Sequence, residues 1–406
     1  MKTAVMYGAG RIGRGLVGAL LAESGYEVVF VDILPELVAR LNETHRYAIF
    51  YVDKNEQITV SGVRAVDGRD QEAVAAEIAR AEFVCTSVKA ENLPAIAPFL
   101  AAGLKQRLAR GAGPLNILIC ENLMDSSKRM TELLSPLLSA QEMQNVGLVE
   151  TTIDRIVPEQ TDPAVIRTES YCHLPMDGDA FLGPIPAIAH TELVSPFHSC
   201  TERKLYMLNM AHATCAYLGT LRGVTLIPEA MAIEAIRRTV TGALAESAQA
   251  LAKKYPAIAS ATFDYAQIIP QRFANPALAD TCARVGADIP RKLSRNDRLI
   301  GAACNVLEQG GTPNHIATGI AAGLLCDLRS GGAALESAPA RLCQLSGLSA
   351  EHPVCQITLQ ALHELAASLY PKIKRAKALV QRIGFPAFRR DAQSGKTVFA
   401  AGLFGA

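Results

Sequence analysis

The sequence predicts an α/β protein in which an N-terminal, doubly wound and mostly parallel sheet is joined to a mainly α-helical C-terminal domain. Short apolar runs typical of buried strands alternate with helical stretches up to about residue 150, as in parallel sheets. Beyond about residue 196 the periodicity is helical. The 406 residues have room for two to three domains. We place them at 1–195, 196–385 and 386–406, the last a tail of uncertain structure.

Composition excludes several classes of function. Half of the residues are hydrophobic, 19% are charged and the formal net charge is +1, so no overall field attracts nucleic acid or an acidic membrane. No apolar stretch is as long as a membrane span needs, and the first residues lack the pattern of a signal peptide. Ten scattered cysteines without a C-x-x-C pair favour reduced thiols over a metal or disulfide framework. We therefore expect a cytoplasmic protein that acts on small molecules.

A glycine-rich turn follows the first expected strand, 3–7, and leads into an expected helix over 12–24. Its glycines have the spacing G-x-G-x-x-G. Gly8 allows a tight turn, Gly10 lets a pyrophosphate approach the backbone, and Gly13 lets the helix pack closely on the strand. The amino end of the helix would offer hydrogen-bond donors to the pyrophosphate. This context predicts a Rossmann-type dinucleotide site.

The second expected strand, 27–31, ends in Asp32, which would accept hydrogen bonds from the adenosine ribose. No arginine follows Asp32 to meet a 2′-phosphate, which favours NAD over NADP. Arg11 and Arg14 would either contact phosphate or lie in solvent. The candidate cofactor-binding residues are Gly8, Gly10, Arg11, Ile12, Gly13, Asp32, Ser87 and Val88.

The alternation continues towards residue 150. We expect a hairpin or irregular insertion over 47–60, helices over 71–81 and 94–110, and strands over 83–87, 116–120 and 146–150. Ligands of such sheets lie at the carboxyl ends of the strands, which places Ser87, Val88, Glu121 and Asn122 near the cofactor and the substrate. Taken alone, Asn122 is better explained as the amide of a turn or of a helix cap than as a site residue.

The C-terminal half follows a connector over 151–200, with helices expected over 229–255 and 358–370. A further buried helix is expected from Lys204 to Leu218, with Gly219 as its stop. At about 100° per residue, Lys204, Asn209 and His212 fall on one side of it. These three polar groups are costly to bury for structure alone. They suit proton abstraction from an alcohol beside a polarised carbonyl.

Basic residues crowd one segment of this nearly neutral chain, including Arg284, Arg291 and Lys292. They would bind an anionic end of a substrate. Alternatively, the segment is a solvated loop, or its arginines pair with Asp280, Asp288 and Asp297. The sequence leaves these interpretations equally open.

The residues described above are similar to those of a known family, the polyol-specific long-chain dehydrogenases, and within it to the enzymes that act on mannitol 1-phosphate. The resemblance covers about residues 1–370. It rests on Gly8–Gly15, Pro114–Asn122, Asp154–Pro158, the K-x4-N-x2-H motif within 202–219, Arg284–Gly286, Arg291–Ser294 and Asp297–Ile300.

The resemblance implies a Rossmann-type domain, a helical domain and an active site between them, with NAD as the cofactor and no catalytic metal. It implies Lys204 as general base, Asn122 and Asn209 as donors to the reacting oxygen, and His212 as a residue that orients the substrate or assists the lysine. Asp154 and Arg155 would support the site, and the substrate-binding candidates are Arg155, Arg284, Arg291 and Lys292. The implied reaction is the oxidation of a polyol phosphate to a ketose phosphate, and its reverse, by a monomer or homodimer.

The sequence departs from the family after Arg284–Gly286. The mannitol-phosphate enzymes usually carry a basic residue there, whereas this chain has Ala287, Asp288 and Ile289. A lost charge-assisted contact would weaken phosphate binding by about 1.5–3 kcal/mol. An unphosphorylated polyol or a hexuronate-derived acid is therefore an alternative substrate. A catalytically silent NAD sensor is a second alternative, which the joint presence of Lys204, Asn209 and His212 disfavours.

Overall fold

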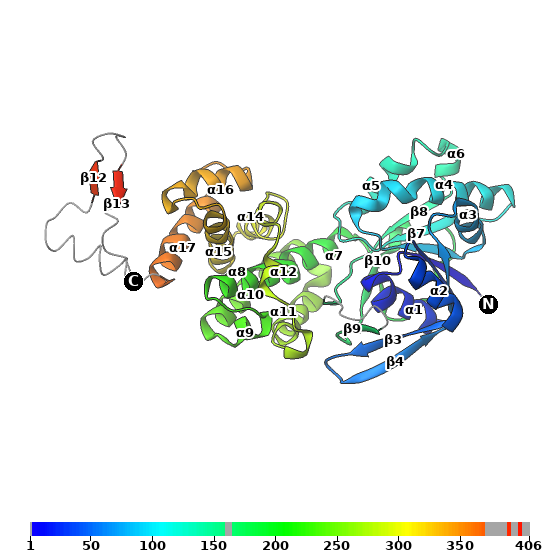
Figure 1. The fold of residues 1–406 in the computed structure, drawn as a ribbon. Helices are drawn as coiled ribbons and strands as arrows, with labels where there is room; N and C mark the ends of the chain where they lie inside the picture. Colours follow the sequence, from blue (N-terminus) through cyan, green and yellow to red (C-terminus); the bar gives the residue numbers. More distant parts are fainter. Residues whose placement is uncertain (1, 159–164, 370–387, 391–396, 400–406) are drawn as a thin grey trace.

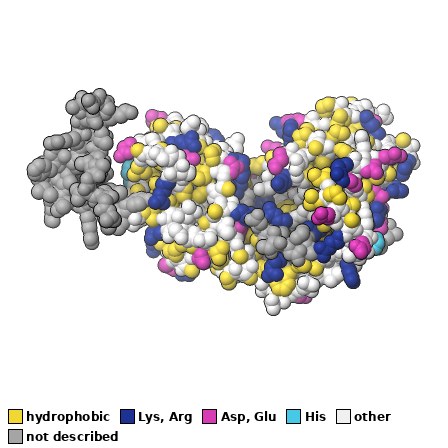
Figure 2. All heavy atoms as spheres, in the orientation of Figure 1, with side chains coloured by type: hydrophobic (Ala, Val, Ile, Leu, Met, Phe, Trp, Pro, Cys, Tyr) yellow, Lys and Arg dark blue, Asp and Glu magenta, His cyan; other side chains and the backbone are white. Residues whose placement is uncertain are grey.

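The computed structural model describes residues 2–158, 165–369, 388–390 and 397–399. The chain forms an α/β domain and a helical domain that lie side by side (Figure 1). Figure 2 shows the surface hollowed between the two domains, with Lys and Arg side chains gathered along their junction.

The α/β domain is built around a six-stranded sheet whose strands all run parallel. The strands lie in the order β5-β2-β1-β6-β7-β8, which is 3-2-1-4-5-6 in order of appearance. Sheets of this order bind dinucleotides where the order reverses, here between β1 and β6. The predicted fold class is confirmed. The strands are β1 (Thr3–Tyr7), β2 (Glu27–Asp32), β5 (Val63–Asp67), β6 (Phe83–Thr86), β7 (Leu115–Ile119) and β8 (Val146–Glu150).

Both faces of this sheet are covered by helices. Side chains along each strand alternate between the two faces, so they enter two separate cores. In β1, Met6 joins the core formed with α1, and Val5 joins the core formed with α3, α4 and α5. This explains why the strands are apolar throughout and not alternating. The covering helices are α1 (Gly18–Glu23), α2 (Pro35–Thr44), α3 (Gln71–Arg80), α4 (Leu93–Ala109), α5 (Ser126–Leu134) and the short α6 (Ala140–Met143).

Two small sheets flank the large one. The predicted hairpin is confirmed as β3 (Arg46–Tyr51) and β4 (Glu56–Ser61), and β9 (Val165–Thr168) adds to it beside β3. A parallel pair is formed by β10 (Leu174–Asp177) and β11 (Thr191–Val194). The segment expected as a connector therefore contains three strands. Of these, β9 pairs with β3, which is distant in sequence, and β10 and β11 pair with each other.

The second domain is helical, as predicted. A continuous helix starts with α7 (His198–Arg203), passes through a π-helical turn over Lys204–Asn209 and continues as α8 (Met210–Leu221). The other helices are α9 (Ile227–Ala232), α10 (Glu234–Lys254), α11 (Ala259–Phe273), α12 (Cys282–Gly286), α13 (Ile289–Lys292), α14 (Ile300–Glu308), α15 (Asn314–Ser330), α16 (Ala338–Ser346) and α17 (Pro353–Leu369). Single 3-10 turns cover Ala90–Asn92, Gly178–Ala180, Pro256–Ile258, Pro276–Leu278 and Leu335–Ser337.

Several predicted helix boundaries in this domain are wrong. The last helix, expected from residue 358, begins at Pro353. Gly219 does not end its helix but lies inside α8, where a Cβ would be 2.7 Å from Sγ of Cys282. Its smallness lets the first residue of α12 approach α8. The single helix expected over 229–255 is two helices, because Ile233 is extended (φ −79°, ψ 114°) between α9 and α10.

The structure also bears on the remaining expectations. All ten cysteines are free thiols. Among the described residues, no helix is both long and apolar enough to cross a membrane. Of the predicted tail, the structure describes only β12 (Phe388–Arg390) and β13 (Thr397–Phe399), an antiparallel pair; its other residues lie outside the described ranges.

Candidate active site

The glycine-rich turn connects β1 to a π-helical turn over Gly13–Val17 that precedes α1. Gly8 has φ +100°, and a Cβ there would be 2.4 Å from the carbonyl oxygen of Ser87. A Cβ on Gly13 would be 1.9 Å from the carbonyl oxygen of Gly8, whereas a Cβ on Gly10 would meet nothing within 4 Å. The backbone is thus crowded at Gly8 and Gly13 and open at Gly10, so the turn fits a pyrophosphate that approaches at Gly10.

Asp32 at the end of β2 fixes the shape of this turn. Its Oδ2 accepts a hydrogen bond from the backbone N–H of Ala9 (2.8 Å), and its Oδ1 accepts one from Leu34 (3.1 Å). The side chains of Ile33 and Leu34 beside it are 64% and 58% exposed. A carboxylate next to exposed apolar side chains suits a ribose and an adenine ring, so the edge of the sheet fits the adenosine half of NAD.

The other cofactor candidates lie around the same turn. The backbone N–H of Ser87 donates to Tyr7 (2.8 Å), and that of Val88 donates to the buried Glu121 carboxylate (2.9 Å). Burial raises the pKa of Glu121. Ile12 packs on the core. These contacts hold the end of β6 against the glycine turn.

The two arginines of the first turn differ. Arg11 donates from Nη1 to the carbonyl oxygen of Pro158 (3.3 Å). Arg14 is buried, not solvated, and its Nε donates to the carbonyl oxygen of Ala9 (2.7 Å). Burial lowers the pKa of Arg14. Arg14 therefore supports the turn from inside the domain.

Lys204 and Asn122 meet across the two domains. Nζ of Lys204 donates to Oδ1 of Asn122 at 3.0 Å, although 82 positions separate them in sequence. Lys204 is 9% exposed, and Asn122 lies just beyond the carboxyl end of β7. Burial lowers the pKa of Lys204, an effect that the Asp154 carboxylate opposes and the Arg298 charge reinforces.

The π-helical turn changes the expected geometry of the lysine's own helix. Backbone bonds of a π-helix join residues five apart, as the bond from the N–H of Met210 to Leu205 shows. Asn209, five residues after Lys204, is therefore about one turn further along and closer to the face of Lys204 than an α-helix would place it. The structure records no direct contact of Asn209 with Lys204 among the described residues. Single π turns inside α-helices are frequent at functional sites.

His212 lies on the next turn, in α8. Its ring stacks on Phe273 with centroids 4.5 Å apart and planes 20° apart. Its Nε2 is 3.4 Å from Oδ2 of Asp280. Burial lowers the pKa of His212, and Asp280 opposes that shift. The imidazole is thus partly buried, stacked on an aromatic ring and in contact with a carboxylate.

The basic segment is largely paired with acids. Arg284 binds Asp280 through Nε (2.6 Å) and Nη2, and Arg291 binds both Asp288 and Asp297. The pairing interpretation is correct for these arginines. Lys292 instead donates to the carbonyl oxygens of two residues, Val285 (2.7 Å) and Ala287. Burial and the nearby arginines lower the pKa of Lys292 to about 8.

Behind the Lys204–Asn122 contact lies a buried ionic cluster. Oδ2 of Asp154 accepts from the Tyr265 hydroxyl (2.9 Å), while its Oδ1 is buried without a partner among the described residues. Arg272 donates to the Asp154 carbonyl and forms an ion pair with Glu169 (2.6 Å). Sequence patterns did not single out Glu169 or Tyr265, because each lies in a stretch without any local motif.

Arg155 binds backbone carbonyl groups within the α/β domain. It is buried and donates to the carbonyl oxygens of Gly15 (2.7 Å), Tyr171 (2.6 Å) and Ser170 (3.4 Å). These bonds tie the segment after β8 to the turn before α1. None of them joins Arg155 to Lys204, Asn122 or His212, so the structure does not bring this substrate-binding candidate together with the others.

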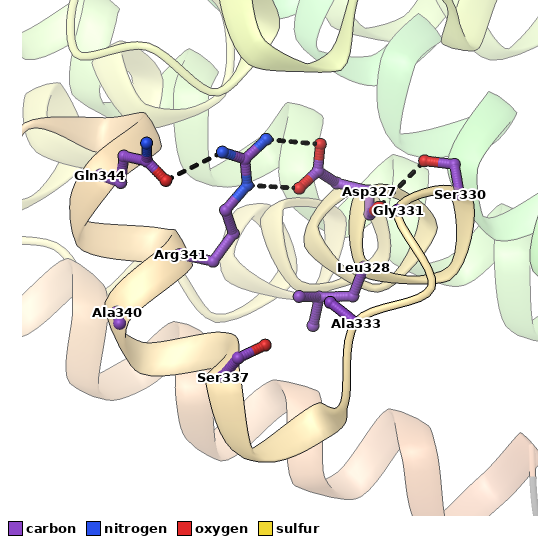
Figure 3. Close-up of a pocket in the computed structure, with 9 residues that line it drawn as sticks. All are labelled: Asp327, Leu328, Ser330, Gly331, Ala333, Ser337, Ala340, Arg341 and Gln344. Carbon is purple, nitrogen blue, oxygen red and sulfur yellow. Dashed lines mark hydrogen bonds and ion pairs between the residues drawn. The ribbon is translucent and has the colours of Figure 1, made fainter.

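A hollow of about 540 Å³ lies elsewhere, between the end of α15 and α16 (Figure 3). Arg341 and Asp327 form a bidentate ion pair along its wall, at 2.6 and 3.0 Å. None of the predicted site residues lines it. The polar groups at the domain junction, and not this hollow, therefore form the candidate active site.

Comparison with known proteins agrees with this geometry. The family model of the mannitol dehydrogenase Rossmann domain matches residues 2–190, and that of the mannitol dehydrogenase C-terminal domain matches 194–331. A mannitol-1-phosphate 5-dehydrogenase of Brevibacillus brevis is 39% identical over 80% of this chain and 86% of its own length. One of Geobacillus stearothermophilus is 37% identical over 86% and 96%.

Solved structures show the same fold at 16% identity. A Pseudomonas fluorescens mannitol 2-dehydrogenase, in ternary complex with NAD and D-mannitol, superimposes with a TM-score of 0.69 over 93% of this chain and 94% of its own. A substrate-free D-sorbitol dehydrogenase has a TM-score of 0.67 over 95% and 94%. The predicted family and cofactor are confirmed: the chain belongs to the mannitol dehydrogenase family and is an NAD-dependent dehydrogenase.

Proposed function

We propose that this enzyme interconverts D-mannitol 1-phosphate and D-fructose 6-phosphate with NAD, using Lys204 as the general base and no metal. The observation that carries the proposal is the 3.0 Å contact of Lys204 with Asn122 at the domain junction. It joins a buried amine to an amide at the ligand-binding edge of the sheet. The relatives named mannitol-1-phosphate 5-dehydrogenase, at 37–39% identity, support the substrate.

The cofactor would be held by three features of the α/β domain. These are the open backbone at Gly10, the Asp32 carboxylate, and the end of β6 at Ser87 and Val88. When bound, NAD accepts the hydride from the alcohol carbon, and in its reduced form returns it. The chain's own part of the reaction is then to handle one proton and to stabilise the charge on one oxygen.

Lys204 is suited to handle the proton. Burial disfavours its charged form, so a larger neutral fraction exists near neutral pH than for an exposed lysine. The neutral amine takes the hydroxyl proton as the carbon–hydrogen bond breaks, which leaves a ketone and a protonated Lys204. In the reverse direction the ammonium returns that proton to the forming alcohol.

Asn122 is suited to stabilise the reacting oxygen. Its Oδ1 accepts the hydrogen bond from Lys204, so the N–H groups on Nδ2 remain as donors. With Asn209 as a second amide, two neutral donors would face an oxygen that becomes more negative as its proton leaves. One such donor contributes about 2.7–4 kcal/mol in comparable sites.

The charged end of the substrate would be met by the basic segment. Over residues 280–298 it carries five basic and three acidic side chains, so a net positive charge remains after the observed pairing. Arg284 belongs to α12, which packs against α8, the helix that carries His212. Lys292 in α13 donates to the carbonyl oxygen of Val285 in α12. The paired state of Arg284 and Arg291 also favours a second candidate, the same reaction on an unphosphorylated polyol.

A substrate panel tests the choice between these candidates. We expect kcat/KM for D-mannitol 1-phosphate to exceed that for D-mannitol by about ten- to a hundredfold, the effect of one charge-assisted contact. The measurement follows NADH absorbance, with fructuronate as a third substrate in the direction of reduction. Pretreatment with a chelator should leave the rates unchanged. Equal values for mannitol and its phosphate would contradict the proposed substrate, and faster turnover of fructuronate would replace it.

A further inference from the structure

Asp280 joins the candidate catalytic helix to the basic segment. It precedes Thr281, whose hydroxyl accepts from the backbone N–H of Arg284 at the start of α12. The backbone carbonyl of Asp280 accepts from the N–H of Ile227 (2.9 Å), and its side chain is 4% exposed. The carboxylate is therefore buried, and the backbone at Asp280 is fixed by the bond from Ile227 and by the Thr281 cap of α12.

This carboxylate is shared by two partners from different helices. Arg284 of α12 binds it through Nε and Nη2, and Nε2 of His212 in α8 lies 3.4 Å from Oδ2. Burial alone would raise the pKa of Asp280, but the bonds from His212 and Arg284 outweigh it and hold the pKa far below its usual value. Asp280 is thus an anion near neutral pH.

An anion at Nε2 decides which ring nitrogen of His212 carries the proton. Since burial lowers the pKa of His212, the ring holds one proton near neutral pH. The favourable place for it is Nε2, where the N–H donates to Asp280. Nδ1 is then an acceptor, and no residue within 2–158 or 165–369 is recorded as its hydrogen-bond partner. The stack on Phe273 keeps the ring in its plane.

We propose that Asp280 is a positioning residue that holds His212 as the Nε2-protonated tautomer, so that Nδ1 accepts a hydrogen bond from a hydroxyl of the polyol substrate. This inference rests on the proposed function, which places the substrate beside His212. The role of Asp280 is orientation and tautomer selection, not proton transfer. The same carboxylate also pairs with Arg284. The position of the His212 ring and that of the basic segment therefore both depend on Asp280.

The first test is spectroscopic and needs no turnover. Nitrogen-15 NMR of the histidine-labelled enzyme, with the His212 signals identified by their loss in His212→Gln, reports which nitrogen is protonated. We expect the Nε2-protonated form in the wild type and a mixed or reversed tautomer in Asp280→Asn. The matched control is Asp327→Asn, which removes another bidentate Arg–Asp pair of the same domain, with Arg341, and should leave the His212 signals unchanged. An unchanged tautomer in Asp280→Asn would overturn the inference.

The second test is kinetic. Asp280→Asn should lower kcat/KM for polyol oxidation by about ten- to a hundredfold, with NADH binding and melting temperature close to those of Asp327→Asn. In a His212→Gln background the same change should have an effect of no more than about twofold, because its target is already absent. Full additivity of the two changes would contradict the inference. If instead no polyol is turned over by the wild type, the proposed function fails while the NMR result stands.

Discussion

Replacing Lys204 with alanine is expected to lower kcat for polyol oxidation by about 10²–10⁴-fold, the usual contribution of a positioned general base. The amine is buried, its pKa is lowered by burial, and it contacts an amide at the cofactor edge of the sheet. Its removal leaves no base at that place. Since the turn at Gly8–Gly13 lies in the other domain, NADH binding should be retained.

The measurement compares single-turnover rates and NADH fluorescence titrations of the wild type and Lys204→Ala. The matched control is Lys253→Ala, which removes an exposed lysine of the same domain that donates to the carbonyl oxygen of Gln309. It should turn over at the wild-type rate. If Lys204→Ala retained turnover within about tenfold of the wild type at every pH, another group would have to be the base.

Replacing Arg272 with methionine is expected to lower the free energy of unfolding by about 3–5 kcal/mol, since it leaves the buried Glu169 carboxylate without its cation. The same change removes the donor to the Asp154 carbonyl and the cation–π contact with Tyr171. The effect should reach the active site, because Asp154 lies close enough to influence the pKa of Lys204.

Thermal and urea denaturation followed by circular dichroism measure this effect. Arg69→Met is the matched control, because Arg69 forms a bidentate pair with Asp67 at the surface, where solvent screens the charges. That variant should unfold at the wild-type midpoint. A shift for Arg272→Met no larger than that for Arg69→Met would show that the Arg272–Glu169 pair does not stabilise the junction.

The local motifs of the sequence were sufficient to predict the parallel sheet and the shape of the glycine-rich turn. The G-x-G-x-x-G spacing and Asp32 depend on backbone shape over one strand and one turn, and the crowding at Gly8 and Gly13 matches it. The apolar strands follow from burial on both faces of the sheet. Lys204 and Asn122 could each be identified from sequence, but their contact across the domains required the family resemblance or the structure.

Other features have no local signal. The π-helical turn over Lys204–Asn209 differs from an α-helix only in which carbonyl each N–H meets, so periodicity at about 100° per residue could not reveal it. Gly219 looked like a helix stop, yet its smallness serves the close approach of Cys282. The strand β9 forms only because β3 lies beside it. The partner of Arg284 was one of several carboxylates available in sequence, and the fold selects Asp280.

The pH dependence of kcat/KM for D-mannitol 1-phosphate oxidation, compared between the wild type and Lys204→Ala, tests the central claim that Lys204 is the base. Oxidation needs the neutral amine, so the wild-type value should rise with pH through the pKa of Lys204, below the ordinary 10.5 of a lysine, and then level off. The residual activity of Lys204→Ala should lack this rise. Were the same rise to persist in Lys204→Ala, the proton would pass to another group, such as Lys292 or His212, and the proposed role of Lys204 would be wrong.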